Sequence, residues 1–370
     1  MEKKNTWEAY SSKQLKELEK INAQYRDFLD NGKTERECID TIVNTIEKSG
    51  YRELESLIKE GTALKTGDKV YSVWMNKSIA MFQIGRKPMT EGMNILGAHI
   101  DSPRLDVKQN PLYEDGGFAY LDTHYYGGVK KYQWVTIPLA IHGVIVKKDG
   151  TCVEINIGEN EDDPVFFVSD LLIHLAQEQL EKKAAKVIEG EALDIIVGNT
   201  YDIHEEDFVS AELEIVPAGK AREAGFDRSM ILAYGQDDRV CAYTSMQAML
   251  DSDVTDRTMC CILVDKEEIG SVGATGMQSH FFENAVAEVM NLTGEYSELH
   301  VRRCLAHSCM LSSDVSSAFD PTYASSFDKK NVAYLGGGMV INKFTGARGK
   351  SGSNDANAEY LAHLRHIFDK

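Results

Sequence analysis

The residues best suited to chemistry are a histidine and several carboxylates that recur where short apolar runs end. In the stretch GAHIDSPRLD, which runs from Gly97 to Asp106, His99 and Asp101 lie two residues apart, shortly after the run MNIL. An imidazole and a carboxylate at this spacing suit a metal ligand and the acid that orients it. Taken alone, the pair favours the simpler interpretation of a buried structural histidine beside a turn-forming aspartate.

Three further acidic clusters follow short apolar runs. They are Asp237 and Asp238 in MILAYGQDDRV, Asp265, Glu267 and Glu268 in MCCILVDKEEIGSVGATG, and Asp314 and Asp320 in CMLSSDVSSAFDP. Ligand sites of open α/β sheets lie at the carboxyl ends of strands, so the four segments are candidates for one shared cleft. Each cluster alone is explained by a helix cap or a solvated turn. Together they place charge at the edge of a core, which a divalent metal would neutralise.

These residue types also suggest a reaction. One imidazole and several carboxylates suit zinc, manganese or cobalt. A carboxylate between two such ions, about 3.5–4 Å apart, bridges them, and the pair polarises a carbonyl and lowers the pKa of a bound water. A glutamate that is not a ligand takes the proton of that water and passes it to a leaving amine. Adjacent glutamates such as Glu267 and Glu268 divide these two tasks naturally, so the set predicts a two-metal hydrolase.

The elements that must position these residues begin with two helices. Apolar residues at steps of three and four predict a helix over 12–31, ended by Asn31-Gly32. A capping box of Thr34 and Glu37 begins a second helix, which ends at Gly50. A hairpin turning near Asn76-Lys77 and then the strand MNILGAHID follow.

The residue composition of the sequence changes after about residue 104. β-Branched and aromatic residues with Gly-Gly and Asp-Gly turn signals predict strands, interrupted by one helical run over 168–187. Near residue 230 the chain returns to strand, loop and helix. We therefore predict an α/β fold with a mixed-sheet, zinc-peptidase-like catalytic domain formed by 1–103 and 231–370. A β-rich domain, 104–230, is inserted into it.

Composition excludes several classes of function. The 40 basic and 58 acidic residues give a net charge of −18 without a compensating basic stripe, so we expect no nucleic-acid partner. No segment approaches the roughly 18 uninterrupted apolar residues of a membrane helix, and the first residues lack the apolar core of a secretory signal. We therefore expect no membrane association. The seven cysteines form no C-x-x-C pair, which favours a reducing cytoplasm.

Four motifs carry a family resemblance. GAHIDSPRL, GQDDRV, DKEEIGS and SSDVSSAFDP, in this order, resemble the M18 family of metalloaminopeptidases, the aspartyl aminopeptidase and aminopeptidase I group. The similarity covers nearly the whole chain, and HYYGGVKKYQW within the insertion supports it. The resemblance implies two divalent metal ions, zinc first and manganese or cobalt as alternatives. It also implies a dimerisation role for the insertion and a homo-oligomer in which dimers assemble into a tetrahedral dodecamer.

The resemblance implies a role for each site residue. His99 is similar to a ligand of one metal, Asp101 to the acid that orients it, and Glu267 to the general base. The other ligands implied are Asp237 as the bridging carboxylate, Glu268 on the second metal and Asp314 on the first. The family's Leu-Asp-Asn is Gln-Asp-Asp here, so Asp238 is the alternative bridge.

Two further residues resemble groups on the substrate side. His174, in DLLIHL, is similar to a histidine that reaches the active site of a neighbouring subunit, and a histidine on a helix surface explains it equally well. Lys343, in VINKF, matches a lysine near the substrate pocket.

The sequence departs from the family pattern in two places. Histidines that often follow the last aspartate motif are replaced by Ser317 and Asp320. The final histidine ligand of the second metal, from a C-terminal Met-His loop, has no counterpart, because His363 and His366 fall on a predicted amphipathic helix. Either the given sequence lacks a C-terminal segment, which we favour, or the second metal site is incomplete.

The prediction from the sequence is a cytoplasmic metalloaminopeptidase that removes N-terminal residues from peptide substrates. A related M42-type or M28-type peptidase would share the Asp-Asp-Arg and Glu-Glu clusters, but the aromatic tract HYYGGVKKYQW argues against it. The alternative of a different class is a non-catalytic subunit that serves as an assembly partner. The missing histidine motivates that alternative.

Overall fold

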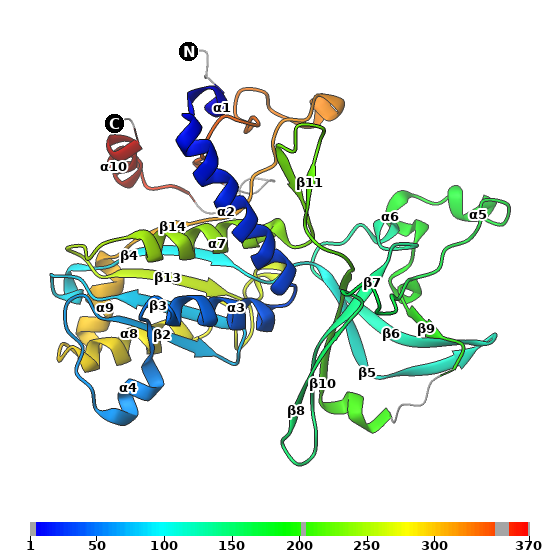
Figure 1. Cartoon of the computed structure of the whole chain (residues 1–370), viewed down its shortest axis with the longest axis horizontal. Coiled ribbons are helices and arrows are strands. Elements are labelled where there is room, and N and C mark those ends of the chain that lie inside the picture. Colours follow the sequence, from blue (N-terminus) through cyan, green and yellow to red (C-terminus); the bar gives the residue numbers. More distant parts are fainter. Residues whose placement is uncertain (1–4, 201–204, 345–354, 369–370) are drawn as a thin grey trace. The chain divides into compact units, whose positions relative to one another are not determined.

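The computed structural model describes residues 5–200, 205–344 and 355–368 (Figure 1). Two compact units are formed, one by residues 23–314 and the other by residues 1–22 with 315–370. The larger unit holds both sheets of more than two strands found in the described residues. In that part of the chain, no helix is long and apolar enough to cross a lipid bilayer.

The first sheet of the larger unit is mixed, and it positions most of the predicted site residues. Its strands, in spatial order, are β1 (Arg52–Glu53), β2 (Lys69–Trp74), β3 (Ser78–Gln83), β13 (Met259–Val264), β4 (Asn94–His99) and β14 (Cys309–Ser312). β4 runs parallel to both β13 and β14, whereas β3 is antiparallel to β2 and β13. The predicted hairpin is confirmed: β2 and β3 pair across a turn in which Met75 and Asn76 both have positive φ, which matches the right-handed twist of the strands.

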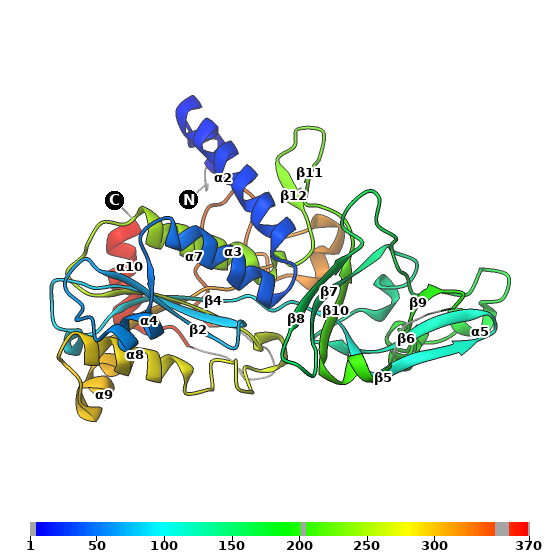
Figure 2. The same ribbon diagram turned by 60° about the horizontal axis from the view of Figure 1, so that its bottom comes forward.

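Helices cover both faces of this sheet, as Figure 2 shows. One face packs on the second half of α2 (Ser12–Asn31), on α3 (Glu35–Glu47) and on α7 (Gln236–Asp251), and the other on α4 (Leu54–Glu60), α8 (Phe281–Leu292) and α9 (Glu298–His307). Both predicted N-terminal helices are confirmed. α3 begins with the capping box, in which Thr34 accepts from the Glu37 amide and Glu37 accepts from the Thr34 amide.

The second sheet lies between β4 and α7 in the sequence. Its strands are β8 (Cys152–Ile157), β7 (Leu139–Val146), β10 (Ala211–Pro217), β5 (Arg104–Asp115), β6 (Phe118–Tyr126) and β9 (Ile195–Gly198), all antiparallel to their neighbours. A separate hydrophobic core, with Leu105, Leu139 and Ile215 fully buried, stabilises it. A small hairpin of β11 (Arg222–Ala224) and β12 (Met230–Leu232) follows.

The helical prediction over 168–187 is wrong. Only α5 (Gln177–Leu180) and α6 (Ala184–Val187), each of four residues, form there. Leu171, Leu172 and Ile173 are each more than half exposed, so the segment has no apolar face packed on a core. Helices gain most of their stability from such packing, which explains why local spacing was misleading here.

The smaller unit joins the two ends of the chain. It holds α1 (Thr6–Ala9), the first half of α2, and α10 (Ala358–Phe368). The Thr6 amide and hydroxyl both donate to the Gly336 carbonyl, at 2.8 Å each. As predicted, His363 and His366 lie on a helix, α10, where both are exposed. Short 3₁₀ helices complete both units: Met89–Glu91, Lys131–Gln133, Gly190–Ala192, Glu205–Ser210, Glu267–Ile269 and Pro321–Ser326.

Candidate metal centre

Three parallel strands of the first sheet end side by side at the candidate site. His99 is the last residue of β4 and pairs in register with Val264, the last residue of β13. β14 pairs Ser312 with Gly97, so Asp314, two residues further on, reaches the level of His99. The acidic segments after β13 and β14 therefore meet at the carboxyl edge of the sheet, where α/β folds bind ligands.

Asp237 reaches this edge by a different route from the one predicted. The apolar run before it forms β12, which belongs to the small hairpin and not to the first sheet. Asp237 lies in the first turn of α7, the helix that packs against β4 and β13. The Ser102 hydroxyl donates to the Asp237 carbonyl at 2.7 Å, which ties this turn to the segment after β4. The residue before α7 is Gly235, no side chain in the described part of the chain caps the helix, and the backbone of Asp237 is not helical, so the helix-cap interpretation of Asp237 is not supported.

The side chains of His99, Asp237 and Asp314 converge. The Nε2 atom of His99 lies 3.3 Å from Asp237 Oδ1 and 4.0 Å from Asp314 Oδ1. One ligand atom from each residue lies within 4.8 Å of the others. Ligands of a tetrahedral zinc ion, at about 2.0–2.2 Å from the metal, are about 3.4 Å apart. The donor set and its spacing therefore fit a zinc ion after small side-chain movements.

His99 is oriented for metal binding by Asp101. The Nδ1 atom of His99 lies 3.0 Å from the Asp101 carbonyl oxygen and 3.2 Å from Asp101 Oδ1. Both neighbours are acceptors, so Nδ1 carries a hydrogen and Nε2 is left to face the carboxylates. His99 and Asp101 are almost completely buried, whereas the side chains of Asp237 and Asp314 are about half exposed, at 53% and 55%. The site is thus rigid on its imidazole side and accessible on its carboxylate side.

The two glutamates follow β13 in a short 3₁₀ helix, Glu267–Ile269. The Oε2 atom of Glu267 lies 3.8 Å from His99 Nε2. Burial raises the pKa of Glu267, although His99 opposes the shift. Burial and then the charge of Asp237 raise the pKa of Glu268 to about 7. Burial is the main cause of both raised values, and the neighbouring carboxylates add to it; a divalent cation would favour the ionised forms of these groups.

The carboxylates around His99 also shift the pKa of its imidazole. Burial lowers the pKa of this imidazole, but hydrogen bonds to Asp101 and Asp237 outweigh burial and raise the pKa to about 11. Without a metal, a proton on His99 supplies positive charge to the cluster. Asp238, the alternative bridge, is completely buried, and burial raises its pKa to about 7. Asp237, which faces His99, is therefore the better candidate ligand.

The two predicted substrate-side residues do not join this cluster within the larger unit. His174 is exposed in a turn before α5, and not on a helix surface. Lys343 is an exposed residue of the smaller unit, and its carbonyl accepts from the Ala356 amide at 2.7 Å. The roles that the resemblance implies for both residues stay predictions.

Two residues near the site were not singled out from the sequence. Ser102 directly follows Asp101 in the H-x-D segment, and its role depends on a contact to α7 that no local pattern encodes. Tyr126, at the end of β6, donates its hydroxyl to Asp101 Oδ2 at 2.7 Å. Its position in the aromatic tract HYYGG was the only available signal, and that tract indicated a strand and not a site.

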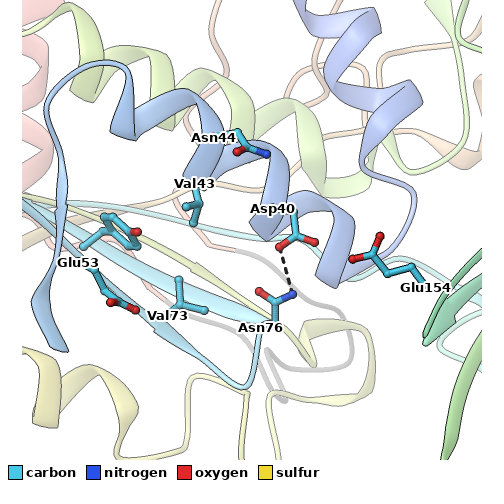
Figure 3. A pocket seen from close by; sticks show the side chains of 8 residues that line it. Asp40, Val43, Asn44, Glu53, Val73, Asn76 and Glu154 are labelled. Atoms are coloured by element: carbon cyan, nitrogen blue, oxygen red, sulfur yellow. Dashed lines mark hydrogen bonds between the residues drawn. The ribbon is translucent and has the colours of Figure 1, made fainter. Parts of the chain in front are cut away.

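A separate hollow of about 490 Å³ lies away from these residues (Figure 3). It is lined by side chains from α3, β1, β2, the β2–β3 turn and β8: Asp40, Val43, Asn44, Glu53, Tyr71, Val73, Asn76 and Glu154. Asp40 accepts from the Asn76 amide at 3.2 Å. None of the predicted site residues lines this hollow.

Comparison with known proteins places this arrangement in a family. A family model described as aminopeptidase I zinc metalloprotease (M18) matches residues 28–199 and 178–368. A probable M18 family aminopeptidase 1 from Clostridium acetobutylicum is 60% identical over 391 residues, which cover 100% of this chain and 84% of the relative. A probable M18 family aminopeptidase 1 from Borreliella afzelii is 41% identical over 395 residues, covering 100% of this chain and 85% of that protein.

Solved structures agree with the sequence relatives. The crystal structure of an M18 family aminopeptidase from Thermotoga maritima superposes with a TM-score of 0.93 at 41% identity, covering 100% of this chain and 84% of that one. The crystal structure of aminopeptidase I from Clostridium acetobutylicum gives a TM-score of 0.90 at 57% identity, covering 99% and 84%. The predicted α/β fold class is confirmed.

The chain belongs to the M18 family of zinc metalloaminopeptidases. It is accordingly an enzyme of the hydrolase class, as the resemblance of its four motifs predicted.

Proposed function

We propose that this chain hydrolyses the N-terminal residue from peptides at the cluster around His99, with two divalent metal ions and with Glu267 as general base. The observation that carries the proposal is the convergence of His99, Asp237 and Asp314, whose ligand atoms lie within 4.8 Å of one another beside Glu267. Zinc is the first candidate because the family model describes a zinc metalloprotease, with manganese or cobalt as alternatives.

The residues divide between two ions. His99, Asp237 and Asp314 would hold the first ion, and Asp237 and Glu268 would contribute to the second. When bound, the metals supply a Lewis acid that polarises the scissile carbonyl and lowers the pKa of water. Asp101 keeps the His99 ring in the tautomer that leaves Nε2 free for its ion.

Glu267 moves the proton. Its side chain is 49% exposed, so Oε2 is accessible to a water molecule and to a peptide. As the water oxygen attacks the carbonyl carbon, Glu267 Oε2 accepts a proton from that water. When the C–N bond breaks, the same oxygen delivers this proton to the leaving nitrogen. The raised pKa of Glu267, caused by burial, favours proton acceptance near neutral pH.

The direct test replaces the base. Metal-stripped protein is reloaded with zinc, manganese or cobalt and assayed on leucyl, aspartyl and lysyl substrates. Glu267→Gln is expected to lower kcat by at least about 100-fold, within the range that general bases contribute, while metal content stays at the wild-type level. Glu288→Gln makes the same chemical change on an exposed position of α8 and serves as the control.

Three results would each contradict part of the proposal. Equal activity of Glu267→Gln and Glu288→Gln would remove Glu267 as the base. Elemental analysis tests the second ion: we expect two ions per wild-type chain and a loss of one in Glu268→Gln. A single ion in both proteins would exclude the dinuclear site. A folded wild type without turnover on any metal would favour the non-catalytic subunit.

We extend the proposal to assembly. The S. cerevisiae mApe1 dodecamer shares the fold, with a TM-score of 0.70 at 20% identity. We propose that this chain also forms homo-oligomers, with the β-rich segment 104–230 as the dimerisation domain of an α/β domain formed by 1–103 and 231–370. Light scattering on a size-exclusion column is expected to give a particle of twelve 41.3 kDa chains, and a monomer would contradict this.

The proposed compartment is the cytoplasm. All seven cysteines are free thiols, and Cys260, Cys261 and Cys304 are buried among apolar residues. Structural disulfides persist in oxidising compartments, so a chain of this kind suits a reducing one. Cell fractionation tests this, and recovery of the protein outside the cytoplasmic fraction would overturn it.

A further inference from the structure

The carboxylate of Asp101 is held from four directions. Oδ2 accepts from the Tyr126 hydroxyl at 2.7 Å and from the Glu268 amide at 3.1 Å. Oδ1 accepts from the Glu267 amide at 3.2 Å and lies 3.2 Å from His99 Nδ1. A carboxylate has about four lone-pair positions, so all of them are used. Asp101 therefore fixes both the candidate ligand His99 and the backbone of the two glutamates.

Of these four donors, Tyr126 alone belongs to the second sheet. It is the last residue of β6, and its side chain is 8% exposed. The Arg104 guanidinium lies 4.0 Å from the centre of the Tyr126 ring, and Lys266 Nζ lies 5.3 Å from it. Both contacts are within the range of cation–π attraction. They hold the ring in place and, being positive, strengthen its hydroxyl as a donor.

Arg104 is itself held rigidly, which makes the ring position well defined. It is the first residue of β5 and is 3% exposed. Its NH1 group contacts Glu35 Oε1 at 2.5 Å, and its Nε group contacts Asp106 Oδ1 at 2.7 Å. Charge-assisted pairs of this kind are short and directional. The Tyr126 ring thus packs against the Arg104 side chain, which connects the start of β5 in the second sheet to Glu35 of α3.

The residue after Tyr126 contacts the same loop from another side. Gly127 has φ of +73°, and a Cβ atom added there would lie 3.2 Å from Glu268 Cβ and 3.3 Å from Glu268 Oε2. The positive φ favours glycine at this position, and a side chain there would be in tight contact with Glu268. The end of β6 therefore approaches the site at two places, at Gly127 beside Glu268 and at the hydroxyl of Tyr126.

We infer that Tyr126 is a positioning residue: its hydroxyl fixes Asp101 and, through Asp101, places His99 and the Glu267–Glu268 loop for metal binding. The inference rests on the proposed function for the identity of the site. Among the hydrogen bonds of the described residues, the Tyr126 hydroxyl has one side-chain partner, Asp101, which orients His99. Within that set, it bonds to none of the candidate ligand side chains. Groups that contact a metal ligand directly, as Asp101 does, typically contribute about 10–100-fold to metal affinity or activity. Tyr126 acts one contact further from the metal.

The test removes one oxygen atom. Tyr126→Phe keeps the ring and its cation contacts and deletes only the hydrogen bond to Asp101. Tyr113→Phe is the matched control, because Tyr113 lies in the same sheet and donates to Asp194 at the same distance, 2.7 Å. Both variants lose one tyrosine–aspartate hydrogen bond, and only one of these bonds leads to the site.

Zinc affinity, measured by competition with a chromophoric chelator, is the first readout. Tyr126→Phe is expected to weaken zinc binding by about 10-fold, the lower end of that range, and Tyr113→Phe to leave it unchanged. The second readout is kinetic: kcat of Tyr126→Phe is expected to fall while the KM of a leucyl substrate stays within about twofold, because the hydroxyl that is removed bonds to Asp101. Equal zinc affinity of the two variants would overturn the inference.

A double-mutant cycle tests the route of the effect. If Tyr126 acts through Asp101, adding Tyr126→Phe to Asp101→Asn is expected to weaken zinc binding much less than in the wild-type background. Equal effects in both backgrounds, or a Tyr126→Phe protein that fails to fold, would make the residue merely structural and would overturn the inference. A wild type that binds zinc without cleaving peptides would reject the proposed function, and the affinity comparison would still decide the role of Tyr126.

Discussion

The Nδ1 atom of His142 lies 2.7 Å from Oε1 of Glu37, and this contact joins β7 of the second sheet to the first turn of α3. Glu37 is also the acid of the capping box, so one side chain both begins a helix and contacts the other sheet. His142 is completely buried, and its Nε2 atom lies 3.0 Å from Glu159 Oε1. A buried imidazole between two carboxylates makes the junction of the sheets sensitive to pH.

The first prediction concerns this sensitivity. Burial lowers the pKa of His142, but Glu159 and Glu37 outweigh burial and raise it above 6.5. A histidine with a raised folded-state pKa adds stability below its unfolded pKa of about 6.5 and loses it as pH rises through the folded value. Urea unfolding between about pH 5.5 and 8.5 is expected to show that His142→Gln lowers the free energy of unfolding most at the acid end. A difference independent of pH would show that the proton is not involved.

The second prediction orders the site residues by their distance from the metal. His99→Ala removes a proposed ligand and is expected to weaken zinc binding by more than about 100-fold, whereas Asp101→Asn removes only the orienting charge and is expected to cost about 10–100-fold. Zinc raises the melting temperature of a protein that binds it in the folded state alone. Calorimetry with and without zinc is therefore expected to show a large shift for wild type, a smaller one for Asp101→Asn and the smallest for His99→Ala. The reverse order of the two variants would contradict the assignment.

The third prediction concerns the buried ion group around Arg104. Burial raises the pKa of Glu35, but the Arg104 charge outweighs burial and lowers it to about 2. For Glu214, burial and then the charge of Glu35 raise the pKa well above its ordinary value. Arg104→Met leaves the Glu35 charge without its partner and is expected to destabilise by about 3–5 kcal/mol. Glu214→Gln replaces an acid that is already favoured in its neutral form and is expected to cost less than about 1 kcal/mol. Urea unfolding at neutral pH measures both, and similar losses would show that Glu214 is ionised.

The fourth prediction compares two glycines of the two sheets. A Cβ atom at Gly143, where φ is +135°, would lie 1.9 Å from the backbone oxygen of Glu212 on the neighbouring strand. A Cβ atom at Gly97 would meet the terminal methyl of Met310, which rotates away easily. Gly143→Ala is therefore expected to lower the melting temperature markedly, and Gly97→Ala only slightly. Thermal unfolding of both variants checks this, and an equal loss would mean that the β4–β14 packing is tighter than Met310 suggests.

Local signals in the sequence predicted the parts of the fold that depend on neighbouring residues. The capping box of Thr34 and Glu37, the turn at Asn76 and the strand that ends at His99 were all predicted, because each is encoded within a few residues. Acidic residues after apolar strands pointed to one edge of a sheet, and two of the three parallel strands bring Asp314 and His99 there as expected. These predictions held because strand alternation, caps and turns are determined by short-range sterics and hydrogen bonds.

The same local rules failed where burial outweighs spacing. Residues 168–187 have helical spacing but no core to pack against, so only two short helices form. Asp237 was expected after a strand of the main sheet, and it lies instead in the first turn of α7. In both cases the outcome depends on which surface the segment meets, and that surface comes from distant parts of the chain.

From the residues alone, the class of enzyme could be inferred, because an imidazole and carboxylates follow strands and four motifs resemble the M18 family, to which the chain belongs. The tertiary structure brings Tyr126 from the second sheet to Asp101, whose carboxylate accepts a hydrogen bond from its hydroxyl. It also separates Asp237, which faces His99, from Asp238, which is completely buried. A residue's type and spacing are local properties, whereas its partners depend on packing between segments far apart in the chain, and no short pattern encodes those contacts.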